Sequence, residues 1–211
     1  MKELMPVRIK DKFLLTFFMI AFLLTDLSAQ DFYIALTYSV AKPTGNTEDF
    51  IGRTSVTGLG LDIRKLIDPN VSVGFFSGWN AFSDEIQSQG VDSLSMLINQ
   101  EKLMNSFPLF VTSHYYFSDD REFIPFIGLG IGIIYIFQSV KDNISTSESN
   151  NWHFGFAPEA GFVYLLGSVY AFIGMKYYYA APVSNEIFNE SLSQSYFAFN
   201  IGIAFVPLGN F

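Results

Sequence analysis

Glu159 and Lys176 are the two side chains whose spacing most directly suggests a shared site. They flank the dipeptide Gly167-Ser168, which has the composition of a two-residue hairpin turn. Residues that face each other across a hairpin keep a constant sum of their numbers, and this register brings Glu159 directly opposite Lys176. Opposite charges stabilise such a cross-strand pair. Buried charges need a partner because leaving water is costly.

Further polar residues fall on the same face of the other candidate strands, so we expect them to line the interior of one closed sheet. They are Asp62, Arg64, Asn80, His114 and Asn200. Two interpretations stay open. In the first, the charges form an ionic plug in an interior that side chains fill, as in small barrels. In the second, they line a narrow pore.

The two histidines give little support for catalysis. Ser113 and His114 are neighbours, so on a strand they point to opposite faces and cannot act as nucleophile and base. His153 lies near a predicted external loop with Glu159 as a candidate acid, but the sequence ties no serine to it. A lipid A-modifying enzyme is therefore a distant alternative, and we expect no catalytic residue.

Metal and cofactor sites are not indicated either. The two histidines are too far apart in the sequence for the usual spacing of metal ligands. The segment Gly128-x-Gly130-x-Gly132 lacks the third glycine and the following helix of a dinucleotide-binding fingerprint. We therefore expect no metal and no cofactor.

Eight segments position these side chains, because in each of them apolar residues alternate with small or polar ones at the period of a β-strand. In the last segment the odd positions from Phe197 to Phe205 are bulky and apolar. The predicted strands lie near residues 32–41, 55–66, 71–82, 107–117, 123–138, 152–165, 169–181 and 196–205. Short turns at 68–70, 118–121 and 167–168 alternate with longer polar segments at 42–54, 83–106, 141–151 and 182–194.

The two faces of these strands differ in a way that favours a lipid environment. One face is bulky and apolar over its middle, and the other is rich in Gly, Ala and Ser. A water-soluble barrel would place its apolar side chains inside and its charges outside. We therefore predict an all-β fold, an antiparallel eight-stranded transmembrane β-barrel with short periplasmic turns and longer external loops. A soluble secreted barrel or sandwich is the alternative.

The N-terminus predicts export. Basic residues precede an apolar run from Phe13 to Leu24, and Ala29 supplies a small residue for cleavage, so residues 1–29 are a predicted signal peptide and 30–211 the barrel domain. The chain has no cysteine for a lipid anchor. It carries 20 acidic against 12 basic residues, and a net charge of −8 argues against a nucleic-acid partner.

Three segments, 125–132, 154–162 and 196–205, resemble the small outer-membrane β-barrel domain family that includes the OmpA-like and OmpW-like barrels. The resemblance implies a location in the outer membrane, with the lipid bilayer and lipopolysaccharide as surroundings. Asn200, Gly202 and Phe205 are similar to the C-terminal signal that the barrel-insertion machinery recognises in this family. Pro207 departs from the pattern, because a hydrophobic strand residue is expected there.

Two functions follow as expectations. The first is a structural or surface-interaction barrel with a side-chain-filled lumen. The alternative is a narrow porin-like or OmpW-like transporter of small or apolar solutes. A water path past Glu159 and Lys176 would favour transport, whereas closure by those two with Tyr170, Tyr178 and Tyr196 would favour the structural barrel. The sequence indicates no solute and no external partner.

Overall fold

The computed structural model describes residues 32–88, 98–117, 122–142, 145–167, 169–187 and 189–205. The predicted signal peptide at 1–29, the predicted turn at 118–121 and Pro207 lie outside these residues. Among the residues that are described, no helix is long and apolar enough to cross a bilayer.

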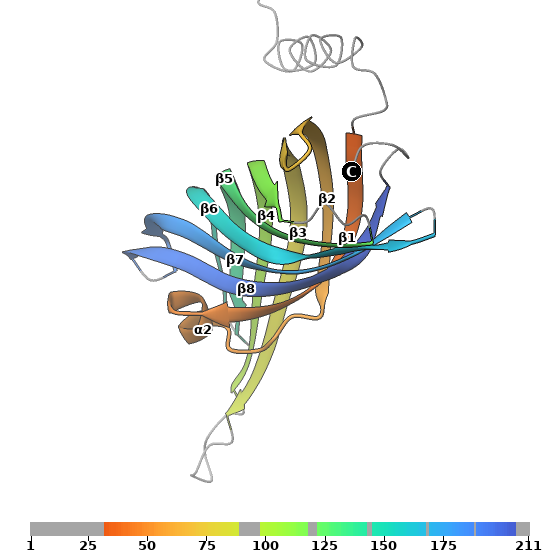
Figure 1. The fold of residues 1–211 in the computed structure, drawn as a ribbon. Helices are drawn as coiled ribbons and strands as arrows, with labels where there is room; N and C mark the ends of the chain where they lie inside the picture. Colours follow the sequence, from red (N-terminus) through yellow and green to blue (C-terminus); the bar gives the residue numbers. More distant parts are fainter. Residues whose placement is uncertain are drawn as a thin grey trace, which may run out of the picture.

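Eight antiparallel strands close into a barrel, in which each strand pairs with the next and the last pairs with the first (Figure 1). Closure runs from Ile34 opposite Phe205 to Thr44 opposite Ser195. The predicted fold class is thereby confirmed. The elements are β1 (Phe32–Thr44), α2 (Asn46–Phe50), β2 (Thr57–Asp68), β3 (Val71–Ser88), β4 (Ile98–Tyr116), β5 (Phe123–Lys141), β6 (Thr146–Leu166), β7 (Val169–Asn185) and β8 (Glu190–Phe205).

The two faces predicted for each strand are the face that points into the lumen and the face that points to the exterior. Along β1 buried and exposed residues alternate strictly from Tyr33 to Ser39. The small and polar face points inward, and the apolar face forms a belt around the outside. Members of that belt include Leu36, Val111, Ile131 and Phe199. Soluble monomers avoid an apolar surface of this extent, so the belt is one that hydrocarbon covers.

Aromatic side chains lie on the exterior toward both ends of the strands, as bilayer-interface girdles require. On the side of the external connections, Trp79 donates a hydrogen bond from Nε1 to Asn105 Oδ1 at 2.9 Å. The exposed aromatics of the two rims are Tyr38, Trp79 and Trp152 at one end and Tyr115, Phe117 and Tyr164 at the other.

Three of the predicted external loops are wrong in extent, because the strands continue through them. β3 and β4 pair out to Ser88 opposite Ile98, and their hairpin extends beyond the neighbouring strands (Figure 1). β5 and β6 pair out to Lys141 opposite Thr146, and β7 and β8 to Asn185 opposite Glu190. Above the membrane the outer face meets water and the buried lumen face is polar, as at Ser149 and Asn185, so backbone pairing continues after the apolar alternation has ended.

The connection between β1 and β2 holds the short helix α2, which the sequence did not predict. α2 packs against β8 and β1 (Figure 1). Thr47 Oγ1 donates to Gln194 Oε1 at 2.8 Å and accepts from the backbone N–H of Ser195 at 2.8 Å. Phe50 and Ile51 are buried in the cluster that fills the external half of the lumen. The helix therefore covers the external mouth of the barrel.

Candidate functional site

The centre of the lumen is an ionic layer built around Glu159. Glu159 on β6 lies opposite Lys176 on β7, and Lys176 Nζ is 3.0 Å from Glu159 Oε2. The same oxygen lies 3.1 Å from His114 Nε2 on β4. Because a carboxylate only accepts, Nε2 carries the proton and donates it. All three side chains are almost completely buried.

A second ion pair lies beside the first, within β2. Asp62 and Arg64 are two residues apart and so share the lumen face. The guanidinium is bidentate on the carboxylate, with Nε 2.9 Å from Oδ1 and Nη2 2.6 Å from Oδ2. Arg64 also donates to Tyr116 Oη at 3.2 Å and lies 4.9 Å from the centroid of the Tyr33 ring. The arginine is therefore paired, stacked and fully enclosed.

The two pairs balance each other in charge. Each carboxylate has one cation, and Lys176 Nζ also lies 3.7 Å from the centroid of the Phe76 ring. This arrangement meets the condition under which charges are tolerated in an interior of low polarity. The space among Asp62, Arg64, Glu159 and Lys176 does not admit a water molecule. The layer therefore closes the lumen at this level.

Aromatic side chains close the lumen on both sides of the ionic layer. On the external side Tyr178 stacks on Tyr196 with ring centroids 4.6 Å apart, and Phe110 stacks on Tyr178 at 6.1 Å. Ser106 and Asn80 contact Tyr196 Oη at 3.0 and 3.4 Å. On the periplasmic side a second buried cluster fills the lumen. It contains Tyr33, Tyr116, Phe126, Tyr170 and Phe172.

The structure places the remaining predicted residues on both faces of the wall. Asn200 faces the lumen and accepts a hydrogen bond from Ser39 Oγ at 2.5 Å. Gly202 follows two positions later on the same face. Phe205 is the last residue of β8 and is half exposed on the exterior. The role of these residues as an insertion signal remains a prediction.

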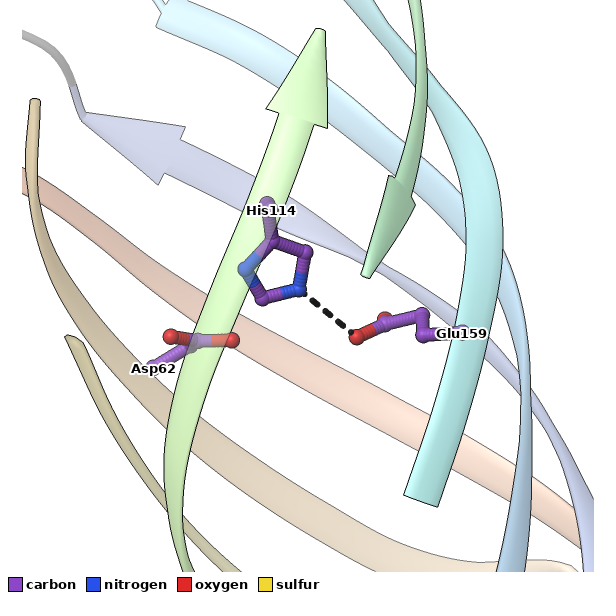
Figure 2. Close-up of side chains that lie close together, drawn as sticks. All are labelled: Asp62, His114 and Glu159. Atoms are coloured by element: carbon purple, nitrogen blue, oxygen red, sulfur yellow. Dashed lines mark hydrogen bonds and ion pairs between the residues drawn. The ribbon is translucent and has the colours of Figure 1, made fainter. Parts of the chain in front are cut away.

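Asp62, His114 and Glu159 form a group that the sequence did not reveal (Figure 2). Their ligand-type atoms lie within 4.8 Å of one another, which would suit a metal ion. Sequence spacing offers only the two histidines as metal ligands, because the heights at which β2, β4 and β6 lie beside one another cannot be derived from it. Arg64 and Lys176 already neutralise both carboxylates, so a divalent cation would add two buried positive charges. The charges therefore oppose metal binding.

A serine also lies closer to His114 than the sequence suggested. Ser72 on β3 is directly opposite His114, and both face the lumen. Ser72 Oγ is 3.2 Å from Tyr116 Oη, and His114 Nδ1 has no hydrogen-bond partner among the described residues. His153 lies apart, with Nδ1 2.8 Å from the carbonyl of Ala181. The candidate acid Glu159 therefore contacts His114 and not His153.

No protein-family model matches the chain, and no curated protein sequence matches it either. Among solved structures, Neisserial surface protein A matches with 16% identity and a TM-score of 0.50 over 82% of this chain and 96% of that chain. Ail of Yersinia pestis, solved with the heparin analogue sucrose octasulfate, has 14% identity and a TM-score of 0.43 over 83% of this chain and 97% of its own. The outer membrane protease OmpT of Escherichia coli has 10% identity and a TM-score of 0.47 over 85% and 98%.

At such identities the likeness concerns the fold alone, and one fold carries many functions. The chain has the fold of the small outer-membrane β-barrels. Its apolar belt, flanked by aromatic residues, is the exterior that such a barrel presents to lipid. The protein is therefore a membrane barrel of the outer-membrane type.

Proposed function

We propose that the protein is an outer-membrane barrel with a closed lumen, which acts through its outer surface and external rim. The observation that carries this proposal is the ionic layer around Glu159 and Lys176. A pore needs a continuous polar path that water and solutes can enter. Here the charges bind one another, and no water molecule fits among them.

Two further features support a closed barrel over a narrow transporter. The stacked rings of Tyr178 and Tyr196 lie directly on the external side of the ionic layer. Above them α2 brings Phe50 and Ile51 into the same buried cluster. A solute would have to displace all three layers in turn.

The absence of enzymatic activity is part of the same proposal. Ser72, which lies opposite His114 in the β3–β4 register, is completely buried. A nucleophile must be reached by its substrate and hydrogen-bonded to its base. Ser72 Oγ instead contacts Tyr116 Oη. The Glu159–His114 pair is better explained as packing of the lumen.

Single-channel recording of the refolded barrel in planar bilayers tests the proposal. A heat-dependent shift in gel mobility first establishes that the barrel is folded. We expect no steady conductance from the wild-type chain. Lys176→Met changes the ionic layer, and Lys141→Met, at the exposed rim, is the matched control. Steady wild-type conductance that changes with Lys176→Met and not with Lys141→Met would establish a pore and overturn the proposal.

A further inference from the structure

A shallow, open apolar groove of about 820 Å³ crosses the lipid-facing surface of β8, β1, β2 and β3 and reaches Phe107 on β4. Tyr38 and Trp79 lie along one edge. The other edge follows the row that joins Leu36 to Leu61 and Leu61 to Ser77 across the strands. Ser77 is the small member of that row, and the space left beside it forms part of the groove.

Two cations, Lys42 near the external end of β1 and Arg53 in the connection that precedes β2, have no carboxylate partner among the described residues. Beyond Tyr38, β1 is joined to the chain before β2 by a bridge between Ala41 and Ser55, with two backbone hydrogen bonds of 2.8 Å. Lys42 follows Ala41 directly, and Arg53 precedes Ser55 by two residues. Both are exposed.

The order of these features along β1 matches the order of the layers of a bilayer. Tyr38 and Trp79 mark the interface, where aromatic rings are found. The groove extends from them into the hydrocarbon region, and Lys42 lies four residues beyond Tyr38 toward the water. This end of the barrel is opposite to Phe32 and Phe205, where the described chain begins and ends, and it carries α2 and the external connections. The cations therefore lie at the level of lipid headgroups in the outer leaflet.

We propose that this surface binds one molecule of lipid A, the phosphorylated glycolipid of the outer leaflet. A phosphate contacts Lys42 and Arg53, and one acyl chain occupies the groove beside Ser77. Charge-assisted hydrogen bonds to phosphate supply the preference for the headgroup. The shape of the groove orders an acyl chain that would otherwise be mobile. The proposal rests on the proposed function only in placing the barrel in an outer membrane.

Trp79 provides a direct reporter, because it lies on the edge of the groove. The chain has two tryptophans, so a Trp152→Phe background leaves Trp79 alone. The refolded barrel in zwitterionic micelles is titrated with lipid A while Trp79 emission is followed. We expect a saturable change with lipid A and a much smaller one with phosphatidylcholine. Phosphatidylglycerol distinguishes a general anionic site, which would bind both lipids equally.

Two pairs of variants separate the headgroup from the acyl chain. Lys42→Gln with Arg53→Gln should weaken binding about fivefold or more, whereas Lys141→Gln, at the rim over β5, should leave it unchanged. Ser77→Leu should weaken binding by filling the groove. Its matched control is Ser113→Leu, which adds the same side chain at another outward-facing serine, on β4.

Equal affinity of the wild-type and Lys42→Gln/Arg53→Gln barrels would overturn the proposal. So would equal responses to phosphatidylglycerol and lipid A, or an emission change that depends on protein concentration alone and so reports a second copy. If Ser77→Leu fails to fold, the charge variants still decide the question. Channel recording is independent of this titration, so the two proposals fail separately.

Discussion

Glu159 is held by two donors that meet at a single oxygen. Lys176 and His114 both contact Oε2, at 3.0 and 3.1 Å, while Oε1 has no hydrogen-bond partner among the described residues. A carboxylate in this setting depends strongly on its cation, because solvent offers no substitute. Removing the cation Lys176 alone should therefore destabilise the barrel more than removing Lys176 and Glu159 together.

Lys176→Met should lower the free energy of unfolding by about 3–5 kcal/mol, because it leaves the Glu159 charge buried without a cation. Adding Glu159→Met should recover most of that loss. Lys176→Glu should be worse than Lys176→Met, and combining it with Glu159→Lys should restore much of the stability, although the hydrogen bond from His114 is lost. Urea titration, with the folded fraction read from gel mobility, measures each step. Double variants no more stable than the singles would contradict the pairing.

Gly128→Ala should destabilise the barrel by about 1–3 kcal/mol, because overpacking a filled interior is costly. A Cβ at Gly128 would collide with the His114 ring, which is held by Glu159 and packs edge-on against Phe126 with ring centroids 5.5 Å apart. Gly174→Ala is the control, since its nearest neighbours lie 3.2 Å or more from the added atom. The same urea titration compares the two, and equal losses would show that the His114 ring can move.

At the scale of elements, register was predictable only where a short turn sets it. The two-residue turn predicted at 167–168 places Glu159 opposite Lys176, and the observed register agrees. The level at which β2 meets β4 and β6 depends on strands that are not neighbours, so Asp62 could not be placed beside His114 from the sequence. The polar ends of β3 and β4 were missed because their alternation carries no apolar signal.

The helix α2 was missed for a related reason. It has five residues, which is too few for a helical pattern of apolar positions to emerge. Its stability comes from contacts with β8, chiefly those of Thr47, and from the burial of Phe50. Such tertiary contacts are invisible in the local sequence.

Thr47→Val keeps the shape of the side chain but removes its hydrogen bonds to Gln194 and Ser195. Each such bond contributes about 1 kcal/mol. Residues 45–56, which include α2, form a lid over the external mouth, and local opening of this lid should become about tenfold or more frequent. Hydrogen exchange of backbone amides in that segment measures the change. Glu48→Gln, on the exposed side of α2, should have no effect. Unchanged exchange in Thr47→Val would mean that the apolar contacts of Phe50 hold the lid alone.

At the scale of the whole molecule, the depth of each exterior residue in the bilayer should govern its tolerance of charge. Ile131→Lys, in the middle of the apolar belt, should cost about 2–4 kcal/mol. Val56→Lys, on a residue of the external connection that is more exposed than Ile131, should cost less than about 1 kcal/mol. Unfolding from lipid bilayers compares the two. Equal costs would contradict the placement of the belt in lipid.

The two ion pairs of the lumen differ in what their charge balance depends on. Asp62 and Arg64 neutralise each other within β2, so their balance needs no pairing between strands. Glu159, on β6, has no cation until β7 brings Lys176 into place. The neutrality of Glu159 therefore depends on the β6–β7 register, because a slip of β7 by one residue would turn Lys176 toward lipid. A shifted β6–β7 hairpin would thus leave an unpaired charge in the lumen, and this penalty favours the observed register.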